Sequence, residues 1–490
     1  MAEEILTPTI PIIGRVRITD IENKFRETFL LADRHVLELV LGGVISNKMP
    51  HLGKPVWIVL VAPSSGGKTA FLDMFSLLQK APYELTYNIG DLTPQTFISG
   101  MVGKKDQSLL KRLHGKVIFC KDFTTIMQKN PDARRELLSQ LREIYDGEFN
   151  KEFGTGASIH WKGNVGFISA LTPIGLDLMQ QHSTMGERFI NYSIQQPPED
   201  ELAQMMKKKY RRTASQIENQ DIALQEMVAE YVSRKVSEAE AMTEPYPIQD
   251  DALDEINEMA IFATRARSPV MLDFKTKEPI DVPIIEGFPR FAMQLQTITK
   301  TLMLMQEGSH DITDRHMEII RKIGLDSIPR KRRLTMQTIA SFNSVSTSAF
   351  SARIGLPTDT ARSWLMELAS LGLVVRIPRG GTGNEDAWKM SAYGAQRMKK
   401  YEGITPSSKN LLNEDEAREL AVPPDQVEEQ KEIQVLQIRN QAITAIQEEL
   451  GEGTSWDEAE VVFLNREAEK NNAEHADMPP MSADEQFEAI

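Results

Sequence analysis

Residues 56–71, VWIVLVAPSSGGKTAF, decide the fold of this chain. The run Val56–Val61 is apolar throughout, which is typical of a parallel strand that is covered on both faces. A loop of small residues follows this run, and Lys68 and Thr69 then begin a segment of helical composition. A strand, a glycine-containing loop and a helix that starts with Lys-Thr are the features of a phosphate-binding loop. We therefore expect an α/β fold with an anion site at the carboxyl end of this strand.

The chemistry of such a loop depends on its glycines, its lysine and its hydroxyl group. Glycine lets backbone N–H groups approach a phosphate closely, and the helix N-terminus adds partial positive charge. In the full pattern the lysine contacts the β- and γ-phosphates of a nucleoside triphosphate, and the hydroxyl binds Mg²⁺. Ala62 replaces the first glycine of that pattern. The alternative is an ordinary strand–turn–helix corner with a surface lysine. The expected phosphate-binding residues are Ala62, Pro63, Ser64, Ser65, Gly66, Gly67, Lys68 and Thr69.

Two further apolar runs, Lys116–Cys120 and Val165–Ala170, are predicted strands of the same sheet. Asp122 follows the first run, at the position where an acid holds the metal or polarises water in a nucleotide hydrolase. Thr172 follows the second run, where its hydroxyl could sense a γ-phosphate. The alternative for each residue is a helix cap or a turn. The alternation of strands, loops and helices indicates a crevice at the carboxyl ends of the strands.

The composition excludes several classes of protein. Cys120 is the only cysteine, so an internal disulfide and a cysteine-rich metal site are excluded. No apolar stretch approaches the roughly 20 residues that span a bilayer. The N-terminus is acidic and lacks the basic-then-apolar layout of a secretory signal. We expect a cytoplasmic protein.

The charge is concentrated at one end of the chain. The formal net charge is −14, but Glu402–Ile490 holds 22 acidic and 6 basic residues, a net of −16. The remaining residues therefore carry a net charge of +2. The overall acidity is a poor argument against nucleic-acid binding.

Residues 335–395 have the pattern of a winged helix. Thr358–Leu371 is the predicted second helix of a helix–turn–helix, and Val374–Ile377 and Ala387–Met390 are strands around a wing. The second helix of such a module lies in the DNA major groove, and nearby arginines meet phosphate. The alternative is a winged helix that contacts protein. The expected nucleic-acid contacts are Thr358, Thr360, Arg362, Ser363, Arg376 and Arg379.

Two basic runs, Lys207–Arg212 and Arg330–Arg333, would strengthen non-specific binding to phosphate. The alternative for each run is a solvated helix face or a linker.

Several segments resemble, in the right order, the AAA+ core of minichromosome maintenance (MCM) helicases. The resemblance covers roughly residues 30–330 and lies in the order and spacing of short motifs. The segments are RHVLELVLGG (34–43), WIVLVAPSSGGKTAFL (57–72), VIFCKDFTTIM (117–127), VGFISALTP (165–173), MGERFINYSI (185–194), PRFAMQLQTITKTLMLM (289–305) and DITDRHMEIIRKIG (311–324).

The resemblance implies an AAA+ P-loop NTPase core with a helical lid, followed by a winged helix as in several members of the family; the charge composition adds an acidic tail. The implied parts are an N-terminal helical segment at 1–50, the α/β ATPase core at 51–198, the lid region at 199–330, the winged helix at 331–401 and an acidic, partly disordered tail at 402–490.

The resemblance also implies roles for single residues. Lys68 and Thr69 would bind the phosphates of ATP and Mg²⁺. Asp122 matches the family's water-polarising acid and is the candidate metal ligand, whereas Lys121 stands where the family has its metal-binding Asp. Thr172 takes the sensor position.

Two arginines complete the implied site. Arg188 would be an arginine finger that reaches the γ-phosphate of a neighbouring subunit, and Arg290 matches the lid arginine. The alternative for each is an ion pair at a surface or interface.

Family members carry a DNA-facing lysine on a hairpin before the sensor strand. The corresponding hairpin is Phe153–Lys162, and the matching position is Gly154. Lys151 and Lys162 lie nearby and could substitute, and Trp161 could stack on a base. The alternatives are a solvated loop and local packing of the indole. No segment matches the family's N-terminal oligonucleotide-binding domain.

The leading hypothesis is an ATP-dependent motor on DNA, a hexameric MCM-like helicase of a phage or mobile element that acts in the host cytoplasm. The acidic tail would then recruit a protein partner. A second hypothesis is an ATP-switched replication initiator or helicase loader without processive unwinding. A third is a regulatory AAA+ protein whose winged helix binds one operator-like site.

Overall fold

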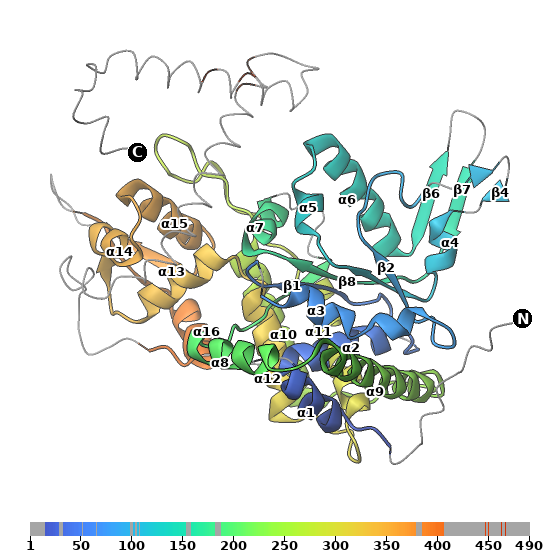
Figure 1. Cartoon of the computed structure of the whole chain (residues 1–490). Helices are drawn as coiled ribbons and strands as arrows, with labels where there is room; N and C mark the ends of the chain where they lie inside the picture. The colour runs from blue at the N-terminus through green and yellow to red at the C-terminus, as the bar shows by residue number, and fades with distance from the viewer. Residues whose placement is uncertain are drawn as a thin grey trace, which may run out of the picture. The chain divides into compact units, whose positions relative to one another are not determined.

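The computed structural model has a parallel sheet of five strands built around the opening stretch (Figure 1). The spatial order is β2-β5-β8-β1-β9, and all neighbouring pairs are parallel. The predicted α/β class with a parallel sheet is confirmed. The sequence located the inner strands but not β2 and β9 at the two edges. The strands are β1 Trp57–Val61, β2 Thr86–Ile89, β5 Val117–Cys120, β8 Gly166–Leu171 and β9 Phe189–Ser193.

Each face of the sheet has its own apolar core. Ile58, Leu60 and Phe119 point to one core, and Val59, Ile118 and Phe167 point to the other, because successive side chains of a strand face opposite sides. The first core is formed with α1 Ile18–Thr28, α2 His35–Ser46, α3 Lys68–Asp73, α9 Ala214–Glu240, α10 Asp250–Arg267, α11 Pro289–Met305 and α12 Asp314–Asp326. The second core is formed with α4 Leu109–Leu113, α5 Thr124–Met127, α6 Pro131–Asp146 and α7 Pro173–Gln181.

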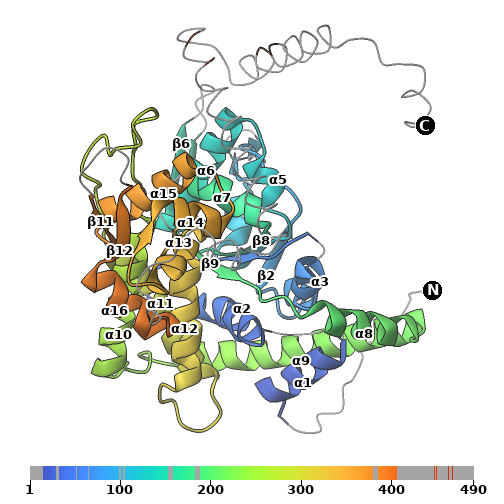
Figure 2. The same ribbon diagram turned by 90° about the vertical axis from the view of Figure 1, so that its left-hand side faces the viewer.

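Local signals fix where the long helices begin. Thr213 and Gln216 form a capping box at the start of α9, and Thr313 and His316 form one at the start of α12. Pro289 occupies the first turn of α11, where its missing N–H costs nothing. Helix α9 packs against α1 and α2, and α8, Glu199–Tyr210, precedes it (Figure 2).

A second, smaller sheet lies in the C-terminal part of the described chain. Its antiparallel order is β10-β12-β11. The fully buried Trp388 of β12 donates a hydrogen bond to Thr347 Oγ1 at 2.9 Å. The elements are α13 Arg330–Ala340, β10 Val345–Ser346, α14 Thr347–Ile354, α15 Thr358–Ser370, β11 Val374–Ile377, β12 Ala387–Met390 and α16 Ala392–Glu402.

Short elements complete the fold. They are the 3₁₀ helix η1 Ser76–Gln79 and two small hairpins, β3 Met101–Val102 with β4 Lys105–Asp106, and β6 Glu148–Glu152 with β7 Ser158–Lys162. Gly154 and the tip of the predicted hairpin lie outside the described residues. The structure describes residues 15–28, 33–50, 52–64, 66–98, 101–102, 105–106, 108–152, 158–181, 188–378 and 385–405 and the isolated positions 446, 449, 462 and 466.

Nearly all of these residues belong to one unit, 1–128 with 134–421; residues 129–133 and 422–490 form another. Among the described helices, none combines the length and apolar character needed to cross a membrane.

Candidate active site

The loop between β1 and α3 lies at a topological switch point of the sheet, where the connections from neighbouring strands run in opposite directions. The chain leaves β1 towards β2 on one side, and it leaves β8 towards β9 on the other side. Right-handed crossovers in opposite directions lie on opposite faces of a sheet. Accordingly, α3 packs in one core and α7 in the other. A crevice outside the carboxyl ends of the strands at such a point is where open α/β sheets bind ligands.

Glycine is required twice in this loop. Gly67 has a φ of +77°, a conformation that side chains strain, and it directly precedes α3. The N–H of Gly66 donates to the Pro63 carbonyl at 3.0 Å, and a Cβ on Gly66 would lie 2.9 Å from that oxygen. The Ala62 N–H is bonded to the Leu171 carbonyl at 3.1 Å, which ties the loop to the end of β8. Ser65 lies outside the described residues.

Lys68 folds back over the loop that precedes it. Its Nζ donates to the carbonyl oxygens of Ala62 at 2.5 Å and Pro63 at 2.6 Å. Burial lowers the pKa of the Lys68 ammonium, and the charge of Asp122 partly opposes that change. The ammonium thus lies above the β1–α3 loop and within electrostatic range of Asp122.

The ends of β5 and β8 are joined by hydroxyl groups. Asp122 Oδ1 accepts the Thr124 N–H at 2.9 Å, and the Phe123 N–H donates to the Ala170 carbonyl at 2.9 Å. Thr124 Oγ1 accepts the Thr172 N–H at 3.1 Å, and Thr172 Oγ1 accepts the Gly175 N–H at 3.2 Å. Thr172 therefore caps the start of α7, and Asp122 forms a turn just before α5, whose N-cap position is Phe123. Both residues nevertheless stand at the carboxyl ends of adjacent strands, near the β1–α3 loop.

Lys121 is engaged by α3. Its ammonium forms an ion pair with Asp73 at the end of α3. Position 121, where the resemblance implies a metal-binding Asp, thus holds a lysine that is paired with Asp73.

The donor chemistry fits Mg²⁺. Thr69 in the first turn of α3 and Asp122 are both exposed, and they supply a hydroxyl and a carboxylate oxygen. Mg²⁺ prefers oxygen ligands and usually takes one or two carboxylates together with substrate phosphates and water. Over the described ranges, no three His, Cys, Asp or Glu side chains form a group that could hold a metal ion.

Arg188, the expected arginine finger, is held within its own chain. Its side chain is only 7% exposed; its guanidinium pairs with Asp146 at 2.8 Å and lies over the Tyr145 ring at 5.6 Å. Arg188 stands at the amino end of β9, about 20 Å of strand away from the β1–α3 loop, so it cannot touch a phosphate held there. The guanidinium is buried within its own chain, as the alternative of an ion pair predicted.

Arg290 lies close to the same group. It is exposed at the start of α11, and the charges of Arg188 and Arg290 both act on the Tyr145 hydroxyl. Gln294 of α11 donates to the Tyr145 hydroxyl at 3.2 Å and to the Arg188 carbonyl at 2.6 Å. The structure thus brings the two predicted arginines together, far from the loop of the same chain.

The expectation for Trp161 is also wrong. The indole is 5% exposed and belongs to the core on one side of the sheet, so it cannot stack on a base. Lys151 and Lys162 face outward but are paired, with Glu136 at 3.0 Å and Glu148 at 2.9 Å.

Helices α14 and α15 and strands β11 and β12 occur where the helix–turn–helix and wing were expected. Thr358 is exposed at the start of α15, and Thr360 is half-buried. Arg362 and Arg376 share one carboxylate, that of Glu278. Arg379 lies outside the described residues.

The basic run Arg330–Arg333 has a structural role in place of the expected phosphate contact. Arg332 is 7% exposed; it pairs with Glu367 at 2.8 Å and donates to the carbonyls of Ala266 and Ser268. Arg333 bonds Asp326 and Glu402.

No family model matches the chain, and a search of the curated proteins finds no match.

Sequence reasoning missed a glutamine that lies beside the loop. Gln196 follows β9 at the same edge of the sheet, and its Nε2 lies 3.3 Å from the position of a Cβ on Gly66. The only signal was its place directly after a fifth strand, and that strand was not predicted.

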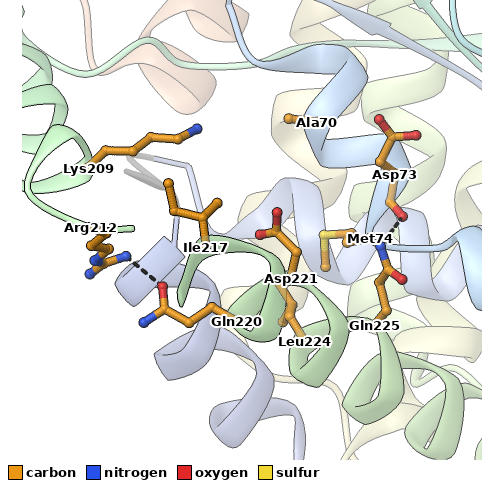
Figure 3. A pocket seen from close by; sticks show the side chains of 10 residues that line it. All are labelled: Ala70, Asp73, Met74, Lys209, Arg212, Ile217, Gln220, Asp221, Leu224 and Gln225. Carbon is orange, nitrogen blue, oxygen red and sulfur yellow. Dashed lines mark hydrogen bonds between the residues drawn. The ribbon is translucent and has the colours of Figure 1, made fainter. Parts of the chain in front are cut away.

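A cavity beside α3 was also missed. It encloses about 130 Å³ between α3, the end of α8 and the first turns of α9 (Figure 3). Buried Met74 and Leu224 line it together with charged and amide side chains. Figure 3 shows the carboxylates of Asp73 and Asp221 and the ammonium of Lys209 around one opening. The remaining lining residues are Ala70, Arg212, Ile217, Gln220 and Gln225.

Proposed function

We propose that this chain binds and hydrolyses ATP at the β1–α3 loop and uses the nucleotide to act on DNA, as an AAA+ protein similar to the MCM helicases. One observation carries the proposal. Lys68 is folded over the Ala62 and Pro63 carbonyls at the topological switch point of the sheet, and Asp122 and Thr172 stand at the next two strand ends.

The residues divide the work as follows. A triphosphate replaces the two carbonyls as the partner of the Lys68 ammonium, and the N–H groups at the start of α3 receive its oxygens. Thr69 and Asp122 would hold Mg²⁺, which would supply positive charge against the charge that develops on the phosphates. The Asp122 carboxylate orients the attacking water, and Thr172 contacts the transferred phosphoryl group.

The cavity beside α3 is a candidate subsite for the ribose of the same ligand, since its volume of about 130 Å³ is below that of pockets that enclose a whole nucleoside. Ala70, which lines it, follows Thr69 in α3. The Asp221 carboxylate can accept hydrogen bonds from ribose hydroxyls, whereas the Asp73 carboxylate already pairs with Lys121. DNA would meet α15 and the β11–β12 wing, as in other winged helices.

A second candidate, the ATP-switched initiator or loader, is favoured by a specific observation. The guanidinium of Arg188 is engaged by Asp146 within its own chain, so completion of a neighbour's site would require that pair to break. A switch needs ATP binding but no such finger.

The test compares Lys68→Ala with the wild type and with Lys80→Ala, which removes an exposed lysine near the end of η1. Lys68→Ala should weaken ATP binding by about tenfold or more, because a charge-assisted contact is lost. Lys80→Ala should bind as the wild type does. Equal ATP affinity in all three proteins would contradict the proposal.

Turnover and strand separation distinguish the two candidates. A motor hydrolyses ATP faster with DNA, separates strands and loses both activities in Lys68→Ala and Arg188→Ala. A switch binds ATP tightly with negligible turnover and is insensitive to Arg188→Ala.

A further inference from the structure

A single carboxylate from a distant segment occupies the arginines expected to bind DNA. Glu278 lies in the connection between α10 and α11. Its Oε1 accepts hydrogen bonds from Arg362 of α15 at 2.9 Å and from Arg376 of β11 at 3.0 Å. Arg376 also reaches Oε2 at 3.3 Å. The two arginines therefore converge on one anionic group.

The connection is folded so that it presents this carboxylate. The Ile280 N–H donates to the Met271 carbonyl at 3.0 Å, and the Asp273 N–H donates to the Glu278 carbonyl at 2.8 Å, which closes a narrow hairpin. Asp273 Oδ1 accepts the Thr276 N–H at 2.7 Å within the turn. At the base, Glu286 forms a two-pronged pair with Arg267 at 2.8 and 2.9 Å. The base is anchored, and Glu278 stands near the other end.

Apolar burial contributes little to holding this hairpin. Its large apolar side chains are mostly exposed: Met271 is 70% exposed, Phe274 75% and Ile280 60%. The side chains of Glu278, Arg362 and Arg376 are themselves 42%, 37% and 32% exposed. Ion pairs with this much exposure are weak and exchangeable.

We propose that Glu278 is an internal competitor of DNA: it neutralises Arg362 and Arg376 in the free protein, and a DNA phosphate displaces it together with the hairpin. Arg376 also pairs with Asp386 at 2.6 Å, which keeps that guanidinium oriented after Glu278 leaves. A guanidinium that binds a carboxylate through paired N–H groups binds a phosphate in the same way. This inference rests on the proposed DNA binding.

The experiment measures the affinity of the full chain for a fluorescein-labelled DNA duplex by anisotropy. Glu278→Gln is compared with Asp281→Asn, which removes one negative charge from the same connection. The exposed Asp281 accepts a hydrogen bond from its neighbour Val282. Glu278→Gln should bind about fivefold tighter than the wild type, and Asp281→Asn should stay within about twofold, because it frees no arginine. The gain should disappear when Arg362→Ala and Arg376→Ala are added.

A second readout does not use DNA binding. Trypsin cleavage after Lys275, whose scissile bond is followed by Thr276 in every variant, reports release of the hairpin, and it should be faster in Glu278→Gln than in Asp281→Asn. Unchanged cleavage in Glu278→Gln overturns the inference. The inference is also overturned if the wild type binds DNA but Glu278→Gln binds it no more tightly than Asp281→Asn does. That result would leave the proposed function standing. Absence of DNA binding in every variant overturns both.

Discussion

At the scale of single residues, the phosphate loop is defined by backbone conformation as much as by its lysine. Gly67 has a positive φ, and no atom lies within 4 Å of the place where its Cβ would be. Its requirement for glycine is therefore conformational, whereas Gly66 is limited by the nearby Pro63 carbonyl. The two glycines can be tested separately.

Gly67→Ala tests the energetic cost of the left-handed backbone conformation at this position. The substitution should cost about 1 kcal/mol of unfolding free energy, since a left-handed conformation is strained for alanine. It should also weaken ATP binding, because relaxation of the turn moves the N–H groups at the start of α3. Urea unfolding and ATP titration provide the two measurements.

Gly90→Ala is the matched control. Gly90 is exposed, also has open space around its Cβ position and lacks a positive φ. Its replacement should leave stability and ATP affinity unchanged or slightly raise stability. Equal effects of the two substitutions would show that the Gly67 conformation is not needed.

The surroundings of a residue could be predicted from the sequence where a local motif determines them. They could not be predicted where segments distant in the sequence determine them. Lys68 follows from its strand and glycines. Trp161 was misjudged because its strand register was not considered: β7 alternates, with Ile159 and Trp161 inward and His160 and Lys162 outward. Arg188 is buried by Tyr145 and Asp146, some forty residues earlier, and no local pattern indicates that contact.

At the scale of elements, the same distinction separates inner from edge strands. β1, β5 and β8 are buried at every position and read as continuous apolar runs. β2 and β9 include polar residues such as Asn88 and Asn191. In β9 the buried Tyr192 hydroxyl is bonded to Asp33 at 2.8 and 2.9 Å, and this distant partner is invisible in the strand's own sequence.

Helix α13 gives a prediction for an element whose basic run looked solvated. Glu367 of α15 is almost fully buried between Lys331 and Arg332. Arg332→Leu should lower the unfolding free energy by about 3 kcal/mol, because it leaves a buried carboxylate with one partner fewer. Urea unfolding measures this loss.

The control for Arg332→Leu also removes the buried carboxylate of Glu367. Arg332→Leu with Glu367→Leu should recover much of the lost stability, since apolar pairs often replace buried ion pairs at little cost. A direct role of Arg332 in phosphate binding would instead appear as weaker DNA affinity without loss of stability, and that result would contradict the structural role.

At the scale of the whole molecule, two buried titratable groups affect the pH dependence of the unfolding free energy in opposite directions. Glu38 of α2 is buried, and burial raises its pKa to about 7 despite its bond to Arg315 at 2.9 Å. His316 of α12 is buried next to Arg315, and burial lowers its pKa to about 4. Between these values, acidification favours the folded protein through Glu38 and the unfolded chain through His316.

His316→Gln should separate the two effects. The neutral imidazole stabilises the folded state fully above the unfolded pKa of about 6.5, and this contribution is lost as the pH falls towards 4. Glutamine keeps a capping-box residue at this position of α12 and does not titrate. Relative to the wild type, the variant should therefore gain about 2 kcal/mol of unfolding free energy between pH about 7 and pH about 4.5. Urea unfolding at the two pH values measures the gain.

His160→Gln, which removes an exposed histidine of β7, should show no such gain. A difference between His316→Gln and the wild type that stays constant with pH would mean that His316 is not held neutral, and the opposition to Glu38 would then fail.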